Sequence, residues 1–139
     1  MYLLDTSVIS ELRKLSSGKT DSHVRSWASQ TLGSTQFLSV ITVMELELGA
    51  LQMERRDARQ GALLHAWIDR IVVPAFDGRI LAVDSAIAKR CASLHVPNPC
   101  SYRDSLIAAT ALVHGMTVAT RDVSHFARTG VPVLNPWEP

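Results

Sequence analysis

The sequence has few of the features that mark secreted or membrane-bound proteins. It holds only two cysteines in 139 residues, too few for a disulfide framework. No apolar run approaches the roughly 20 residues that a membrane-crossing helix needs. No succession of basic, apolar and small residues at the N-terminus has the form of a signal peptide. We therefore expect a protein of the reducing cytoplasm that makes no contact with a membrane.

An excess of charge of one sign is also missing. Lysine and arginine total 14 against 13 aspartates and glutamates, for a formal net charge of +1. This balance excludes a strongly basic nucleic-acid coat but allows local basic patches. Internal repeats, low-complexity runs and long linkers are lacking too, while 47% of the residues are hydrophobic. That composition supports a sizeable core, and the length predicts one domain over residues 1–139.

Short apolar runs alternate with helical patterns along the chain. The apolar runs predict strands at residues 2–4, 37–40, 71–73, 117–120 and 131–134. Apolar residues at helical spacing predict helices from residue 6, around residues 24–28, and over residues 42–52, 55–70, 84–94 and 101–114. Strands that alternate with helices indicate an α/β fold with a mainly parallel sheet.

Four acidic residues fall at matching places in this pattern. Asp5 and Asp122 follow predicted strands, while Glu45 and Asp104 lie in the first turns of predicted helices. In an open parallel sheet these positions share one rim, where ligands bind. Clustered carboxylates are the ligands that magnesium or manganese prefers, and without cations they repel one another. The corresponding chemistry is metal-assisted hydrolysis of a phosphodiester.

Each of these acids also has a purely structural interpretation. Asp5 and Asp122 are suitable helix N-caps, Asp104 fits a capping box with Ser101, and Glu45 fits a solvated helix face. Taken singly, no acid of the set identifies a site.

The choice between two neighbouring glutamates stays open at this point. Glu45 shares a helix face with Thr42 and Gly49, whereas Glu47 points nearly opposite. Only one of the two glutamates can therefore face the rim. Gly49 is also predicted to let another segment approach that face closely.

The residues around the four acids resemble the PIN-domain family, most closely toxins of the VapC and FitB type. The resemblance covers essentially the whole chain and is carried by ordered motifs at residues 3–6 with 8–12, 39–49, 104–111 and 117–122, and by the ending at residues 135–137. It implies a three-layer α/β/α sandwich with a central, mainly parallel sheet. It also implies that the metal-binding and catalytic residues are Asp5, Glu45, Asp104 and Asp122.

The resemblance further implies a function and its partners. It indicates a magnesium-dependent endoribonuclease, with manganese as an alternative metal, that acts as the toxin of a type II toxin–antitoxin pair. A cognate VapB-like antitoxin would inhibit it, and the toxin would form a homodimer within a larger toxin–antitoxin assembly. Operator DNA would be contacted only through the antitoxin. The RNA that is cleaved is not identified by the sequence.

Two other functions are compatible with parts of the sequence. The first is a catalytically weak PIN domain that acts mainly as a binding partner in an antitoxin–DNA complex. The second is a phosphatase of the haloacid dehalogenase type, which typically needs a second aspartate two positions after the first. Ser7 stands at that position and no convincing lysine motif follows, so the phosphatase ranks low.

Several neighbours of the acids are predicted to support the site. Thr6, Ser7 and Thr120 are candidate supporting hydroxyls, and Arg121 is a candidate phosphate contact. Relatives often carry asparagine where this chain has Ser7, and serine cannot reproduce the donor and acceptor of the amide. We expect that difference to affect the catalytic rate rather than the metal site. Arg103 is predicted to pair with a surface acid.

Other polar groups give weaker signals. Cys91, His95 and Cys100 lie near one another in sequence but lack a recognised fourth ligand for zinc. Basic residues at 13–14 and 55–59 are predicted to lie on solvated helix faces rather than on RNA.

Overall fold

The sheet forms the centre of the protein, as seen in a computed structural model that describes residues 1–139. Its strands are β1 (Tyr2–Leu4), β2 (Gln36–Ser39), β3 (Ile80–Leu81), β4 (Thr117–Ala119) and β5 (Val133–Leu134). The strand order is β3-β2-β1-β4-β5, and every neighbouring pair is parallel. The predicted α/β fold with a mainly parallel sheet is therefore confirmed.

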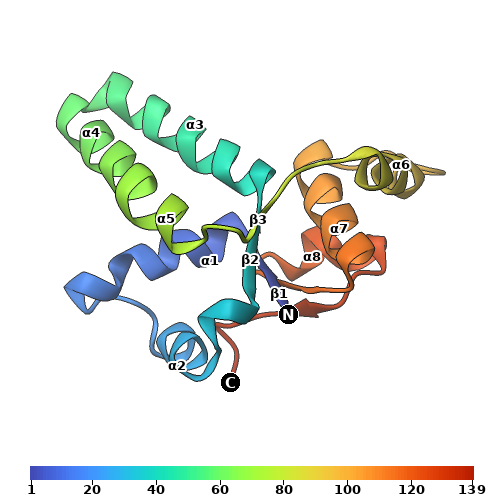
Figure 1. Cartoon of the computed structure of the whole chain (residues 1–139), viewed down its shortest axis with the longest axis horizontal. Helices are drawn as coiled ribbons and strands as arrows, with labels where there is room; N and C mark the ends of the chain where they lie inside the picture. The colour runs from blue at the N-terminus through green and yellow to red at the C-terminus, as the bar shows by residue number, and fades with distance from the viewer.

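Helices cover both faces of this sheet (Figure 1). They are α1 (Thr6–Leu12), α2 (Ser22–Gln30), α3 (Val40–Arg56), α4 (Ala58–Trp67), α5 (Val73–Ala75), α6 (Ser85–Leu94), α7 (Tyr102–His114) and α8 (Val123–Phe126). In Figure 1, helices α1, α2, α4 and α5 lie to the left of the strands, and α6, α7 and α8 lie to the right. This arrangement is the predicted three-layer sandwich. None of these helices combines the length and the hydropathy that a bilayer crossing requires.

The two faces of the sheet carry separate hydrophobic clusters because neighbouring strand residues point to opposite sides. Leu4 packs with Val8 and Leu46 against α1 and α3. Leu3, one residue earlier, packs with Ile107 and Phe126 against α7 and α8. The burial of both leucines fixes the register of β1 and so the position at which the strand ends.

The predicted strand at residues 71–73 is wrong. The segment is helical, with a π-helical turn at Ile68–Val72 that leads into α5. Its β-branched residues favour a strand, but Ile68 and Val72 lie four residues apart and enter the core together with Phe76. Pro74 lies at the start of α5, directly after the π-helical turn.

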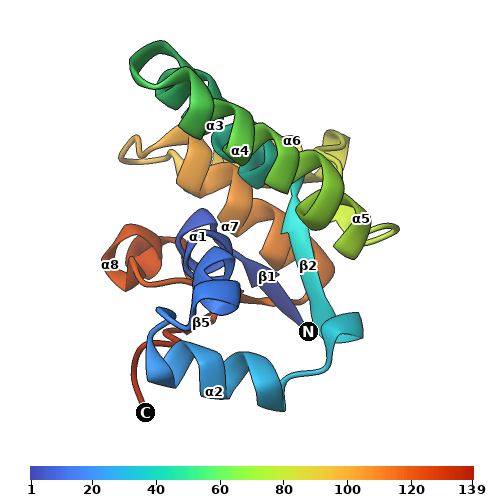
Figure 2. The same cartoon turned by 90° about the vertical axis from the view of Figure 1, so that its left-hand side faces the viewer.

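The boundaries of two predicted helices also differ from the structure. Helix α3 is longer than the predicted range 42–52, and the predicted helix over 55–70 is interrupted at Asp57. The Asp57 carboxylate accepts a hydrogen bond from the backbone N–H of Gln60 at 3.1 Å and so caps α4. The interruption folds α3 and α4 into the antiparallel pair at the top of Figure 2. Strand β3, only two residues long, was not predicted.

The close approach between α3 and α4 occurs at Gly61. A Cβ atom there would lie 2.5 Å from the Cα of Glu54, so we expect Gly61→Ala to lower the free energy of unfolding by about 1–3 kcal/mol despite the better helix propensity of alanine. Thermal unfolding of the purified protein measures this. The matched control is Gly49→Ala, which has no atom within 4 Å of the new methyl group and should add stability, by about 1 kcal/mol. Equal stability of the two variants would contradict the packing argument.

The close approach of another segment that was predicted at Gly49 is wrong. No atom of another segment lies within 4 Å of a Cβ built at this position.

Candidate metal and active site

The topology of the sheet brings two of the acids together. Strand β1 lies between β2 and β4, so the chain winds outward in one direction through β2 and β3, and in the other through β4 and β5. Ligands of such sheets bind at this switch point, beyond the carboxyl ends of the strands. Asp5 directly follows β1, and its backbone N–H donates to the carbonyl of Ala119 at 2.9 Å. Asp122 lies three residues after Ala119, the last residue of β4.

Asp5 is the most buried acid of the set, with 7% of its surface exposed. Its Oδ1 accepts a hydrogen bond from the backbone N–H of Thr6 at 2.8 Å, and its Oδ2 accepts one from the hydroxyl of Thr120 at 2.7 Å. The Thr120 oxygen in turn accepts the backbone N–H of Asp122 at 2.9 Å. The fully buried Thr120 thus links the two strand-end acids, as predicted for a supporting hydroxyl.

Glu45 is the glutamate that faces these acids. Its Oε1 accepts a hydrogen bond from the Thr6 hydroxyl at 3.1 Å. Glu47 instead points toward α4 and lies 3.0 Å from a ring nitrogen of His65. The two glutamates therefore face different parts of the molecule, as the helical wheel required.

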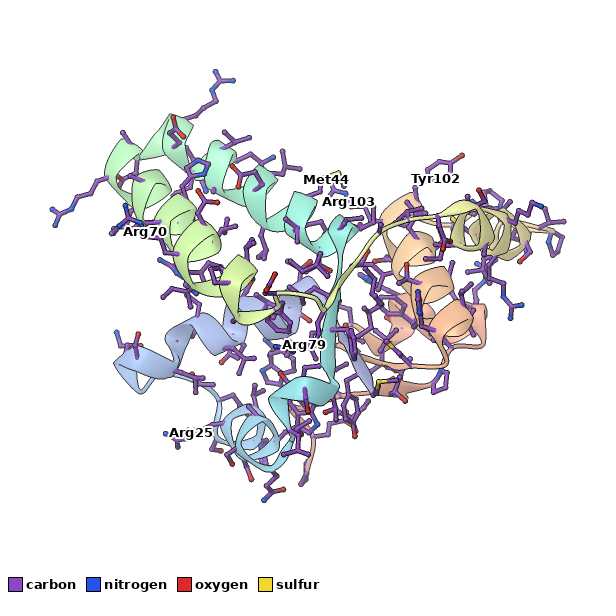
Figure 3. The ribbon with its side chains drawn as sticks, viewed as in Figure 1. Arg25, Met44, Arg70, Arg79, Tyr102 and Arg103 are labelled. Atoms are coloured by element: carbon purple, nitrogen blue, oxygen red, sulfur yellow. The ribbon has the colours of Figure 1, made fainter.

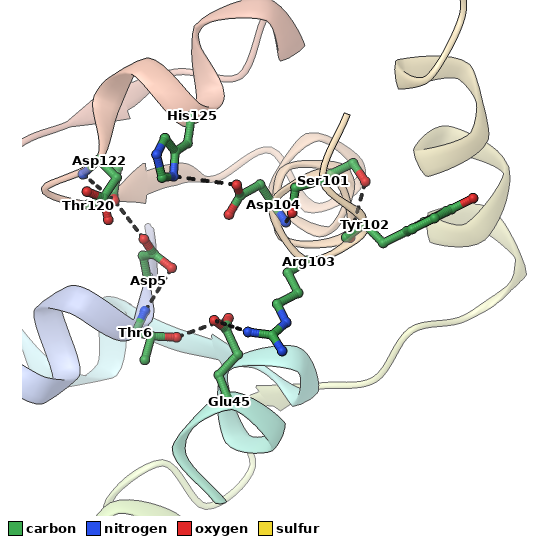
Figure 4. A network of polar contacts seen from close by, with 11 residues as sticks. Asp5, Thr6, Glu45, Ser101, Tyr102, Arg103, Asp104, Thr120, Asp122 and His125 are labelled. Carbon is green, nitrogen blue, oxygen red and sulfur yellow. Dashed lines mark hydrogen bonds and ion pairs between the residues drawn. The ribbon is translucent and has the colours of Figure 1, made fainter. Parts of the chain in front are cut away.

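Arg103 also contacts Glu45. Its guanidinium lies 3.8 Å from Glu45 Oε2 (Figure 4). The predicted pairing of Arg103 with an acid is present, but the partner belongs to the acid cluster rather than to the outer surface. Figure 3 shows Arg103 near Met44, where α3 and α7 approach each other.

Asp104 enters the cluster from the start of α7. The Ser101 hydroxyl caps this helix and accepts the backbone N–H of Asp104 at 3.4 Å. The Asp104 carboxylate lies 3.5 Å from Nδ1 of His125 on α8. His125 was missed in the sequence, where the only signal is its position one helical turn after Asp122.

The electrostatics show that the four carboxylates act on one another. Burial is the main cause that raises the pKa of Asp5, and the charges of Asp104 and Asp122 add to it. Burial likewise raises the pKa of Glu45 and of Asp104, with repulsion from neighbouring acids. Hydrogen bonds from Thr6 and Thr120 and the nearby charges of His125 and Arg103 offset only part of this effect. A cation among these groups would relieve the repulsion.

The donor set fits a hard divalent cation. Figure 4 shows the four acids around a common opening, with each carboxylate supplied by a different segment of the chain. No group of three Asp, Glu, His or Cys side chains is placed so that all three could bind one metal ion directly. That spacing is compatible with magnesium, which usually keeps several waters and takes only one or two carboxylates from a protein.

Two of the acids, Asp5 and Asp122, were also candidate helix N-caps. Asp5 is a helix N-cap, since it accepts the N–H of Thr6, yet its carboxylate also belongs to the cluster. Asp122 precedes α8 without any capping hydrogen bond from its side chain. The alternative of a mere cap therefore does not account for Asp122.

Ser7 and Arg121 meet at the edge of the cluster. The Ser7 hydroxyl accepts the backbone N–H of Arg121 at 3.2 Å, so it ties α1 to the segment after β4. The Arg121 guanidinium lies 5.2 Å from the ring centre of Trp137, a cation–π contact that orders the C-terminal residues.

The cysteine and histidine residues near α6 form an internal network. One ring nitrogen of His95 lies 2.8 Å from the Ser105 hydroxyl, and the other accepts the backbone N–H of Cys100 at 3.4 Å. The Cys91 thiol donates to the same hydroxyl at 3.3 Å. These contacts join α6 to α7, and they occupy both ring nitrogens of His95.

Comparison with known proteins extends these observations. The sequence pattern of the PIN domain matches residues 2–132. VapC ribonuclease Y4jK of Sinorhizobium fredii is 38% identical over 100% of this chain and 99% of its own length. Toxin FitB of Neisseria gonorrhoeae is 36% identical over 99% of both chains.

Solved structures of FitB-containing complexes show the same similarity over the whole chain. The crystal structure of FitAcB from Neisseria gonorrhoeae matches with a TM-score of 0.88 and 35% identity over the full length of both chains. A structure of FitAB bound to the IR36 DNA fragment matches with a TM-score of 0.88 and 35% identity over 100% of this chain and 97% of that one. The chain therefore belongs to the PIN-domain family, and its relatives there include VapC and FitB proteins.

Proposed function

We propose that the chain is a magnesium-dependent endoribonuclease and the toxin of a type II toxin–antitoxin pair. The observation that carries this proposal is the convergence of Asp5, Glu45, Asp104 and Asp122 on one rim, where burial and mutual repulsion raise the pKa of three of them. Relatives named VapC ribonuclease and Toxin FitB, similar over the whole chain, support the same function.

Three of the four acids are the proposed metal ligands for hydrolysis. Asp5, Asp104 and Asp122 would hold the metal, directly or through water, with manganese as a substitute for magnesium. When bound, a divalent ion activates water and stabilises the charge that develops on the phosphoryl oxygens.

The remaining residues orient these groups. Thr6 holds Glu45, which completes the metal site or orients the attacking water. Thr120 fixes Asp5 and the backbone of Asp122. Arg121 lies at the edge of the cluster, where it can contact a phosphate.

The proposed partners follow from the relatives. FitAB has been solved on a DNA fragment, which supports a cognate antitoxin for this chain and contact with operator DNA through that antitoxin. A homodimer of the toxin within such an assembly is part of the proposal.

The proposal is tested by incubating the antitoxin-free protein with total RNA. We expect cleavage with magnesium, none with EDTA, and a loss of roughly 10³-fold or more for Asp104→Asn, because several kcal/mol of metal-assisted stabilisation disappear. The control is Asp69→Asn, an exposed aspartate outside the cluster, which should cleave as the wild type does. A folded protein that cleaves no RNA with any divalent metal would favour the binding-partner alternative, and cleavage that persists in EDTA would exclude the metal mechanism.

A further inference from the structure

The acid cluster opens on one side into a groove of mixed polar and apolar lining that the proposed chemistry does not use. The groove has a volume of about 690 Å³ and lies between α8 with its following turn and the loop that joins α6 to α7. It shares Asp104 and His125 with the site. In Figure 4 these two side chains meet across the space between α7 and α8. The groove is therefore continuous with the place where the scissile phosphate would lie.

The lining of the groove suits a nucleic-acid strand. Its basic members are His125 and Arg128, and Asp104 at the shared end is its only acid. Asn98, Ser101 and Thr129 add neutral hydrogen-bonding groups. Cavities of roughly 300–1,000 Å³ enclose most of a drug-sized ligand, so this volume is sufficient for a nucleotide.

Arg128 is the group in this groove that is free to bind a phosphate. It is exposed, and its guanidinium makes no ion pair, hydrogen bond or ring contact within the chain. Arg103 and Arg121 do not line this groove; Arg103 is paired with Glu45, and Arg121 lies over Trp137 at the edge of the acid cluster.

The opposite side of the cluster has a different character. The cavity beyond Glu45 is smaller, about 250 Å³, and Leu46, Leu64 and Trp67 line it together with Arg13. The Arg13 guanidinium lies over the Trp67 ring, 5.7 Å from its centre. This side therefore offers a phosphate backbone only one basic group, which is already in contact with a ring, whereas such a backbone is bound by charged and hydrogen-bonding groups. The two sides of the acid cluster are therefore not equivalent.

We propose that single-stranded RNA leaves the acid cluster through the groove at Asp104, with Arg128 contacting the phosphate of a nucleotide next to the cleaved bond. This inference rests on the proposed ribonuclease function and adds the direction of the strand. Arg128 is a binding residue in this account and takes no part in the chemical step.

The test is the binding of a fluorescein-labelled, mixed-sequence single-stranded RNA oligonucleotide to antitoxin-free protein in EDTA, followed by fluorescence anisotropy. We expect Arg128→Ala to weaken binding about three- to tenfold at low salt. The slope of log K against log salt should fall by about 0.7, the value for one lost phosphate contact on a single strand. Arg128→Lys keeps the charge and should keep the slope.

The matched control is Arg70→Ala, an exposed arginine without an ion pair that lies beside the α3–α4 hairpin, away from α7 and α8 (Figure 3). It should bind as the wild type does. Equal affinities and equal salt slopes for Arg128→Ala and wild type would overturn the proposal, as would equal losses in both arginine variants. Because this assay needs no cleavage, its failure is separate from a failure of the nuclease test.

A kinetic measurement with magnesium gives a second readout. A residue that contacts the strand equally in the ground state and the transition state changes KM rather than kcat. We expect Arg128→Ala to raise KM about three- to tenfold, the same factor as for RNA binding, with kcat nearly unchanged. A fall in kcat at unchanged KM would contradict the assignment of Arg128 to strand binding.

Discussion

Replacing Asp5 with asparagine is expected to abolish metal-dependent RNA cleavage while the fold persists. The asparagine oxygen can still accept the N–H of Thr6, and its amide can donate to Thr120, whose hydroxyl is able to rotate. The variant loses the central negative charge of the cluster, so we expect a fall of roughly 10³-fold or more in kcat/KM. Cleavage of labelled RNA with magnesium measures it, and circular dichroism checks the fold. A folded Asp5→Asn protein with near-normal activity would remove Asp5 from the site.

The same variant should make the metal-free protein more stable at neutral pH. Burial raises the pKa of Asp5 above its ordinary value of 3.8, so the folded protein keeps this proton to a higher pH than the unfolded chain does. The Asp5 contribution therefore favours folding at acid pH and is lost as the pH rises from 3.8 through the raised pKa. Asparagine has no such proton to lose.

Thermal unfolding in EDTA at several pH values measures this difference. The midpoint of the wild type should fall relative to that of Asp5→Asn as the pH increases toward neutrality. Magnesium should restore stability to the wild type more than to the variant, because a bound cation stabilises only the state that binds it. A constant difference between the two proteins across the pH range would contradict the raised pKa of buried Asp5.

Thr120→Val is expected to damage both stability and catalysis. The fully buried hydroxyl donates to Asp5 and accepts the backbone N–H of Asp122, and valine keeps its shape without replacing either bond. We expect the free energy of unfolding to fall by about 2–3 kcal/mol. Cleavage should fall about 10- to 100-fold, as for other residues that orient metal ligands.

Thr110→Val is the matched control for this substitution. Thr110 is equally buried, but its hydroxyl donates only to the carbonyl of Leu106 one helical turn earlier. That carbonyl keeps its helical partner, so we expect a small change in stability and unchanged cleavage. If the two valine variants behave alike in both assays, the link between Thr120 and the acids has no special role.

The fold and the acid cluster were largely predictable from the sequence because both depend on short-range patterns. Apolar strands followed by Asp5 and Asp122 can be recognised in the sequence, and a parallel sheet brings their ends to one rim. The helical wheel placed Glu45 and Glu47 on different faces without choosing between them, and only the resemblance to the PIN-domain family favoured Glu45. The structure shows that Glu47 contacts His65 instead. The supporting hydroxyl of Thr120 was predictable for the same reason, since it lies in the residue directly after β4.

The features that were not predicted depend on contacts between distant segments. The β-branched residues at 71–73 favour a strand, but the burial of Ile68 and Val72 on one helical face outweighs that preference. His125 faces Asp104 across two helices, and no spacing within the sequence brings them together. The pairing of Arg103 with Glu45 and the contact of Gly61 with Glu54 are of the same kind.

The assignment of the four carboxylates to one divalent-cation site underlies the proposed function. Its most direct test is a titration of the metal-free protein with Mn²⁺, followed by the EPR signal of the free ion. We expect saturable binding by the wild type, competition by Mg²⁺, and a strong loss of binding in Asp5→Asn and Asp104→Asn but not in Asp69→Asn. Binding that is absent from the wild type, or unchanged in the two cluster variants, would contradict it.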